Sequence, residues 1–188
     1  MMTIDQFSTT CVTNKNRVVT LRLLSPEDVE ESRRYINQIS AEDTYIGFSG
    51  EQLTSEEEQK YIQDSVHAMT KRDSLHLVAE FEGRIVAMCD ARRDLSLKKR
   101  SAHIAQFGLT VAQDFRGEGL GGAILSRTIA LLPDYISDIS VLKLGVFGPN
   151  QVAQSLYRKL GFQEYGRLPK GILYRDEFVD HVFMYKSI

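Results

Sequence analysis

The feature that most constrains this chain is a cluster of glycines at residues 117–122. Gly117, Gly119, Gly121 and Gly122 fill four of these six positions. The cluster follows an apolar run at 102–111, typical of a strand, and precedes an amphipathic run at 120–132 that predicts a helix. A helix start presents unpaired N–H groups and the positive end of the dipole, and glycine lets a ligand approach the main chain. The turn therefore indicates a cradle for a pyrophosphate group.

The surrounding sequence separates several kinds of glycine turn. Gly117, Gly119 and Gly122 match the G-x-G-x-x-G of dinucleotide sites, but such a site also uses an acidic residue at the end of the next strand. Here that strand ends in Phe147-Gly148-Pro149, and no Lys-Ser/Thr pair follows the glycines as in a P-loop. A nucleotide-binding oxidoreductase is therefore the alternative enzyme class. A turn that only packs a helix closely is the alternative structural interpretation.

Hydrophobic periodicity predicts the element order β-α-α-β-β-β-α-β-α-β-β. The predicted strands span 18–24, 75–81, 84–92, 102–111, 141–147, 162–168 and 178–186, and the predicted helices span 25–39, 54–69, 120–132 and 151–160. Hairpins make the early strands antiparallel, and the strand–helix–strand unit over 102–147 is expected to be parallel. We therefore expect a mixed α/β fold with a mostly antiparallel, seven-stranded sheet and helices on both faces. Residues 1–17 are expected to be a loosely held lead-in before one domain at 18–188.

Bulk properties exclude several classes of protein. The 188 residues carry a formal net charge of −2, so no strong field draws the chain to nucleic acid or to an anionic membrane. The sequence has no signal-peptide pattern and no apolar run of transmembrane length, so a cytoplasmic location is expected. The two cysteines, Cys11 and Cys89, suggest neither a disulfide framework nor a metal site.

Three segments together resemble a known family. Arg116-x-x-Gly119-x-Gly121 resembles the acetyl-CoA signature of the GCN5-related N-acetyltransferase (GNAT) superfamily. Leu109-Thr110-Val111 resembles the family's L-x-V strand end, and residues 150–162 resemble its N-x-x-A-x-x-L-Y-x-K-x-G-F segment. The resemblance covers Val18 to the C-terminus and is weakest between residues 40 and 74. It implies the GNAT-type acyl-CoA N-acyltransferase fold, with a parallel β-α-β core that binds acetyl-CoA.

The resemblance also implies an activity. The expected enzyme uses acetyl-CoA as co-substrate and transfers the acetyl group to a primary amine by direct attack in a ternary complex. The C-terminal run at 165–184 resembles the tails of small-molecule and amino-acid N-acetyltransferases, so a small molecule, an amino acid or a polyamine is favoured over a protein acceptor. A homodimer is expected from the family. A non-catalytic acyl-CoA sensor or scaffold is the alternative that keeps the same pocket.

The family pattern assigns the cofactor site to these positions. Main-chain N–H groups of the glycine turn are expected to hold the pyrophosphate, and the L-x-V main chain is expected to pair with the pantetheine arm. Glycines inside the two neighbouring strands, Gly108 and Gly145, are expected to mark a bulge or a close approach of the ligand. The expected cofactor-binding residues are Leu109, Thr110, Val111, Arg116, Gly117, Glu118, Gly119, Leu120, Gly121, Gly122 and Asn150, and Asn150 also has the sequence position of a helix cap.

The reaction further needs a proton donor for the thiolate and a proton acceptor for the amine. Tyr157 matches the family tyrosine that acts as the general acid. No carboxylate stands at the family's usual positions for a base, so water or His103 is expected to take the proton. The acceptor amine is expected to enter near Tyr45, Phe48 and Glu51, and near Tyr174, Asp176, Glu177 and Asp180, although most of these carboxylates are interpreted as ordinary solvated groups.

Overall fold

The computed structural model describes residues 7–188, so the part of the predicted lead-in at residues 1–6 lies outside the described residues. Over these residues the fold is a mixed α/β fold with eight strands, most of them paired antiparallel. The chain divides into two compact units. The first, here the N-terminal unit, contains the residues up to Arg92 together with Gly108–Ser137, and the second, here the C-terminal unit, contains Arg93–Phe107 together with Asp138–Ile188.

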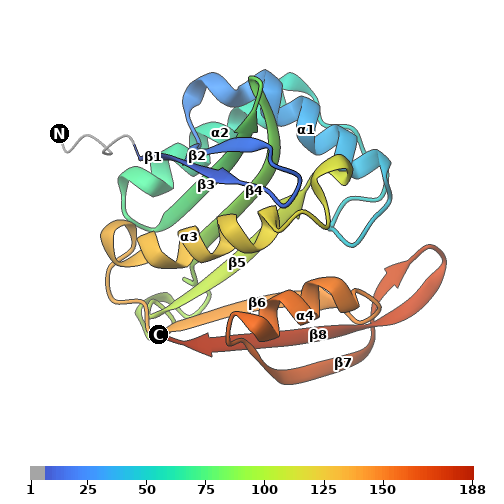
Figure 1. Ribbon diagram of the computed structural model, residues 1–188. Helices are drawn as coiled ribbons and strands as arrows, with labels where there is room; N and C mark the ends of the chain where they lie inside the picture. The colour runs from blue at the N-terminus through green and yellow to red at the C-terminus, as the bar shows by residue number, and fades with distance from the viewer. Residues whose placement is uncertain (1–6) are drawn as a thin grey trace. The chain divides into compact units, whose positions relative to one another are not determined.

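Strands of the N-terminal unit follow one another as antiparallel neighbours. They are β1 (Ser8–Val12), β2 (Val18–Leu23), β3 (Ser74–Phe81) and β4 (Arg84–Arg93). The expectation of an irregular lead-in was wrong over β1, which pairs with β2 as the first hairpin in Figure 1 and raises the strand count from seven to eight. The segment STTCV has only modest strand propensity, and its pairing with the edge of β2 supplies the main-chain hydrogen bonds that stabilise it.

Three helices cover the strands of this unit. They are α1 (Val29–Ala41), which follows a short 3₁₀ turn, α2 (Ser55–Thr70) and α3 (Leu120–Tyr135). The first six residues of β3 are all buried, although side chains alternate between the two faces of a strand. Both faces are therefore covered, as expected, and α2 and α3 both pack against β3 (Figure 1).

Local signals explain where several elements begin and turn. The Thr54 side chain accepts a hydrogen bond from the Glu57 amide, and the Glu57 carboxylate accepts one from the Thr54 amide, which confirms the predicted capping box of α2. Glu82 and Gly83 both have positive φ, at 51° and 77°, which confirms a tight turn between β3 and β4.

The C-terminal unit contains the parallel pair. Strand β5 (Ile104–Val111) begins in this unit and pairs in parallel with β6 (Val141–Phe147) over Ile104–Gln106, which confirms the predicted parallel unit. The remaining elements of this unit are α4 (Gln151–Lys159), β7 (Gln163–Tyr174) and β8 (Glu177–Ser187). Strand β8 pairs antiparallel with β6 and with β7. None of the helices in residues 7–188 is long and apolar enough to cross a membrane.

Candidate active site

The glycine turn forms the start of α3 in the N-terminal unit. Gly117 and Gly119 have φ angles of 73° and 84°, in the left-handed region that glycine adopts without strain. Gly119 is the N-cap of α3, and the first helical hydrogen bond is donated by the Ala123 amide to its carbonyl at 3.1 Å. The amides of Leu120, Gly121 and Gly122 precede that bond, so they belong to the set that an α-helix leaves without an intrahelical acceptor. This geometry suits an anion.

Glu118, in the middle of the turn, has its side chain buried and directed to the β1–β2 turn. Its carboxylate accepts hydrogen bonds from the Thr13 hydroxyl at 2.9 Å and from the Arg17 guanidinium, with Nε at 3.0 Å, and Lys15 lies 3.2 Å away. The Asn14 amide donates to the Glu118 carbonyl at 2.9 Å. Among the expected cofactor ligands, Glu118 is therefore available only through its main chain. These partners were missed because they lie in the expected lead-in, about a hundred positions away in the sequence.

Acid is expected to weaken this contact. The hydrogen bond from Arg17 is the largest cause that lowers the pKa of Glu118, from 4.5 to about 2. A carboxyl group with a depressed pKa in the folded state stabilises the fold above its unfolded pKa and loses that contribution as the pH falls through the folded value. We expect the Glu118→Gln variant to melt several degrees below the wild type at pH 7, and the difference to shrink between about pH 4.5 and pH 2. Melting curves across this range check the prediction; a difference independent of pH would contradict it.

The L-x-V segment is held in place by contacts to α1. The Tyr35 hydroxyl donates to the Thr110 hydroxyl at 2.9 Å. Arg116 donates from Nε to the Val111 carbonyl at 2.9 Å, and its Nη2 forms an ion pair with Glu42. Arg116 thus ties the end of β5 to the end of α1, and about 39% of its side chain stays exposed beside the glycine turn.

Two strand glycines are approached by side chains of the adjacent strands. A Cβ at Gly108 would lie 2.6 Å from Oδ1 of Asp90, and a Cβ at Gly145 would overlap Nε2 of His181. The groups that approach both glycines in this structure are protein side chains, and the expected approach of a ligand stays a prediction. At each position a methyl group would displace a charged or titratable side chain.

The remaining expected site residues lie in the C-terminal unit. Asn150 accepts from the Ala153 amide at 3.1 Å, which confirms it as the cap of α4. Tyr157 lies on α4 with about 8% of its surface exposed, and its ring centroid lies 6.0 Å from that of Phe162. His103 was expected within a strand, but it lies exposed in the turn before β5, where its carbonyl accepts from the Ser140 amide at 2.9 Å. Residues 101–103 form a turn, so the strand begins at Ile104, two residues later than predicted.

The expected acceptor carboxylates have local partners. Glu51 accepts from the Ser49 amide and hydroxyl within its own loop, which lowers the pKa of Glu51. Asp180 accepts from Arg167 at 3.1 Å across the β7–β8 ladder. Asp176 has a φ of 63° in the turn between these strands. These contacts agree with the interpretation of most of these carboxylates as solvated surface groups.

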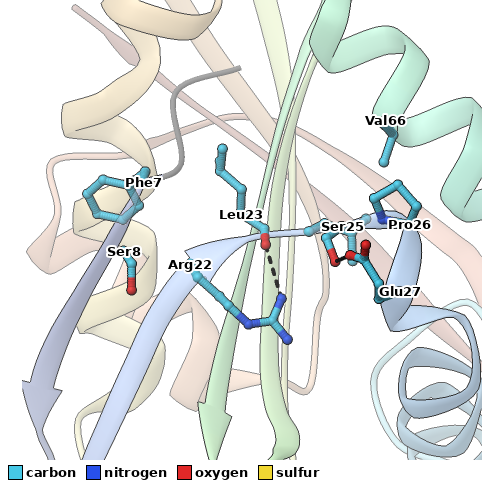
Figure 2. A pocket seen from close by; sticks show the side chains of 9 residues that line it. Phe7, Ser8, Arg22, Leu23, Ser25, Pro26, Glu27 and Val66 are labelled. Atoms are coloured by element: carbon cyan, nitrogen blue, oxygen red, sulfur yellow. Dashed lines mark hydrogen bonds between the residues drawn. The ribbon is translucent and has the colours of Figure 1, made fainter. Parts of the chain in front are cut away.

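A separate hollow of about 410 Å³ lies between the first strands and α2 in the N-terminal unit (Figure 2). Its polar groups are already engaged. Arg22 donates to Asp28 at 2.7 Å and 2.8 Å and to Glu80 at 2.8 Å, while Glu27 accepts from Ser25 at 2.7 Å. The lining residues are Phe7, Ser8, Arg22, Leu23, Leu24, Ser25, Pro26, Glu27 and Val66. Because ligand sites present converging groups that are ready to bind, the glycine turn is the stronger candidate.

Comparison with known proteins agrees with the geometry of this turn. The model of the "Acetyltransferase (GNAT) family" matches residues 30–162, which include the glycine turn and α4. The chain belongs to the GNAT family. An L-amino acid N-acetyltransferase, AaaT, from Escherichia coli K12 is 29% identical over 108 residues, which are 57% of this chain and 65% of that relative. The match therefore spans slightly less than two thirds of the relative's length.

Solved GNAT structures share the fold. A GNAT-family acetyltransferase from Streptococcus pneumoniae superposes with a TM-score of 0.81 and 27% identity, over 90% of this chain and 99% of that one. YncA from Salmonella typhimurium, a putative acetyltransferase solved with its cofactor acetyl-CoA, superposes with a TM-score of 0.77 and 18% identity, over 90% and 93% of the two chains. At that identity the second likeness concerns the fold alone.

Proposed function

We propose that this protein is an acetyl-CoA-dependent N-acetyltransferase that acetylates a primary amine on a small molecule, such as an amino acid or a polyamine. The observation that carries the proposal is the start of α3, where Gly119 caps the helix in a left-handed conformation and three further amides precede the first helical hydrogen bond. Amides in this arrangement bind the oxygens of a diphosphate, which coenzyme A contains.

The relatives support the same ligand and the same class of reaction. YncA was solved with acetyl-CoA, and the microcin C7 self-immunity acetyltransferase MccE with acetyl-CoA and AMP. The relative AaaT acts on L-amino acids by its name. In this chain, the pantetheine arm is proposed to pair with the main chain of Leu109–Val111, and Asn150 and the Arg116 guanidinium are proposed to contact the cofactor.

The chemistry is proposed to proceed by direct attack of the amine on the thioester carbonyl. Tyr157 is proposed to give its hydroxyl proton to the departing thiolate, as a general acid. Burial raises the pKa of the Cys89 thiol, so this cysteine stays protonated and is a poor nucleophile. A covalent acetyl-enzyme is therefore not part of the proposal. The sequence suggests water or His103 as the group that takes the proton from the amine.

The test is amine-dependent release of coenzyme A. Purified protein is incubated with acetyl-CoA and a panel of the free L-amino acids and putrescine, and the thiol is measured. We expect release that depends on at least one amine, with the acetylated product identified by mass spectrometry. Melting curves with acetyl-CoA and with NAD(P)H distinguish the acetyltransferase from the oxidoreductase alternative, because a ligand that binds the folded protein raises its melting temperature. Binding of acetyl-CoA with no release in the presence of any amine would favour the sensor or scaffold instead.

A further inference from the structure

One face of β4 carries an oppositely charged pair of side chains that the proposed function leaves unassigned. The Arg92 Nε donates to Oδ2 of Asp90 at 2.9 Å, and about 28% of the Asp90 side chain is exposed. The two residues are two positions apart, so they project to the same side of the strand. Arg92 also donates to the Tyr61 hydroxyl of α2 at 3.1 Å. The carboxylate is thus oriented by a guanidinium that α2 holds in turn.

A buried histidine lies directly across from this carboxylate. His76 on β3 is the register partner of Asp90, and side chains of directly opposite residues share one face. Only 2% of His76 is exposed, and its ring stands edge-on to Tyr61 with centroids 6.2 Å apart. Among the described residues, neither ring nitrogen of His76 has a hydrogen-bond partner. His76 is thus a buried polar side chain beside the partly exposed Asp90 carboxylate, and the two form one polar cluster between β3 and β4.

Strand β5, the other neighbour of β4, leaves room for the Asp90 carboxylate at Gly108. Oδ1 of Asp90 lies 2.6 Å from the position that a Cβ on residue 108 would take, so a larger residue there would push the carboxylate away from its present position. Gly108 directly precedes Leu109, the first residue of the main chain proposed to pair with the pantetheine arm. With the pyrophosphate at the glycine turn, that arm would run from Val111 toward Leu109 and Gly108, along the edge of β5 that does not pair with β4. The thioester end of the arm would then lie beside Gly108, toward which the Asp90 carboxylate reaches from β4.

We propose that Asp90 is the carboxylate that binds the ammonium group of the acceptor and takes its proton, while Arg92 and Tyr61 position it. The inference rests on the proposed acetyl transfer and adds the residue that binds the ammonium group of the acceptor and takes its proton. An ammonium group donates up to three hydrogen bonds, and a partly exposed carboxylate with one oxygen bound to Arg92 retains acceptor capacity for it.

The step balances as follows. A proton moves from the ammonium nitrogen to the Asp90 carboxylate, and the neutral nitrogen forms a bond to the thioester carbonyl carbon. The carbon–sulfur bond then breaks, the nitrogen loses a second proton as the amide forms, and the thiolate takes up one proton. The net product of the reaction besides the amide and the thiol is one proton, which Asp90 holds and then releases to water.

The test compares two strand carboxylates in the same kind of setting. The Asp90→Asn variant removes the charge with almost no change of shape. Glu80→Gln is the matched control, because the Glu80 side chain is 32% exposed and accepts from the Arg22 Nε at 2.8 Å. We expect Asp90→Asn to lower kcat/KM for the best acceptor about 10²–10⁴-fold, with unchanged acetyl-CoA affinity by calorimetry. The control is expected to keep wild-type activity.

A pH profile distinguishes loss of the proton acceptor from structural damage. Without the Asp90 carboxylate, only the neutral form of the amine reacts. We therefore expect kcat/KM of Asp90→Asn to rise about tenfold per pH unit between pH 6 and 9, while kcat/KM of the wild type stays constant. The titratable groups around Asp90 are not expected to change charge between pH 6 and 9. Burial lowers the pKa of His76 to about 4, burial raises the pKa of Tyr61 and of Cys89, and the pKa of Arg92 is raised.

A second variant reaches the same carboxylate from β5. Gly108→Ala forces Oδ1 of Asp90 to move, so we expect it to lower kcat/KM at least tenfold in the wild type and to add nothing in the Asp90→Asn background. Equal activity of wild type and Asp90→Asn on an accepted amine overturns the inference and leaves the acetyltransferase standing. The inference is also overturned if the wild type and Asp90→Asn have parallel pH profiles while His103→Gln loses rate. His103 would then be the group that takes the proton. A wild type that releases no coenzyme A with any amine overturns both proposals.

Discussion

The Gly121→Glu variant is expected to lose acetyl-CoA binding while remaining folded. Its side chain would occupy the space above the first-turn amides of α3, and its charge would repel the diphosphate. A glutamate in the first helical turn is itself compatible with the helix dipole, so the fold is expected to persist. We expect affinity to fall by at least about 100-fold, which corresponds to about 2.7 kcal/mol. Calorimetric titration with acetyl-CoA measures the effect, and the melting temperature reports the fold.

Two related variants separate the causes of that loss. Gly121→Gln has nearly the same shape without the charge, so the difference between the two variants measures repulsion alone. Gly119→Glu is expected to lose binding too, but also to destabilise the protein, because Gly119 has a φ of 84° and a side chain there costs about 1–2 kcal/mol. Wild-type affinity in Gly121→Glu would show that the diphosphate does not bind at this turn.

The Tyr157→Phe variant is expected to lower kcat by about 10²–10⁴-fold and to leave the affinity for acetyl-CoA nearly unchanged. Its aromatic ring would keep its contact with Phe162, with centroids 6.0 Å apart, so the packing of α4 is retained. The variant removes the hydroxyl whose proton is proposed to reach the thiolate. Steady-state kinetics with the best amine acceptor measure the effect.

The matched control for this tyrosine is Tyr165→Phe on β7. Tyr165 is 56% exposed, and its ring packs against Phe183 and Tyr185. The control variant is expected to turn over as fast as the wild type. If Tyr157→Phe also keeps the wild-type kcat, water or another group protonates the leaving thiolate, and the proposed role of Tyr157 is wrong.

Local chemistry made much of the fold predictable from the sequence. The capping box at Thr54 and Glu57, the turn at Glu82-Gly83 and the cap at Asn150 each depend on residues within a few positions, and the structure confirms all three. The glycine turn was recognisable for the same reason, since left-handed backbone angles and a helix start are properties of a short segment.

The failures of sequence reasoning concern partners far apart in the chain. Strand β1 has little intrinsic preference for its conformation and depends on pairing with β2. The segment that contacts Glu118 and the carboxylate that fills the space beside Gly108 belong to other elements. A glycine inside the strand predicted a bulge or a close approach of the ligand at Gly108, and the fold shows that the Asp90 side chain approaches it. The acceptor side of the site was for this reason the least predictable part.

The burial of Glu118 makes the charge of the glycine turn depend on a segment about a hundred positions away. An acidic side chain inside a turn suited to diphosphate opposes an anionic ligand unless cations and hydrogen-bond donors compensate for it, and these come from Thr13, Lys15 and Arg17. A variant that lacks these three side chains would leave the Glu118 charge without these partners. The turn between β1 and β2 therefore sets the net charge at the start of α3.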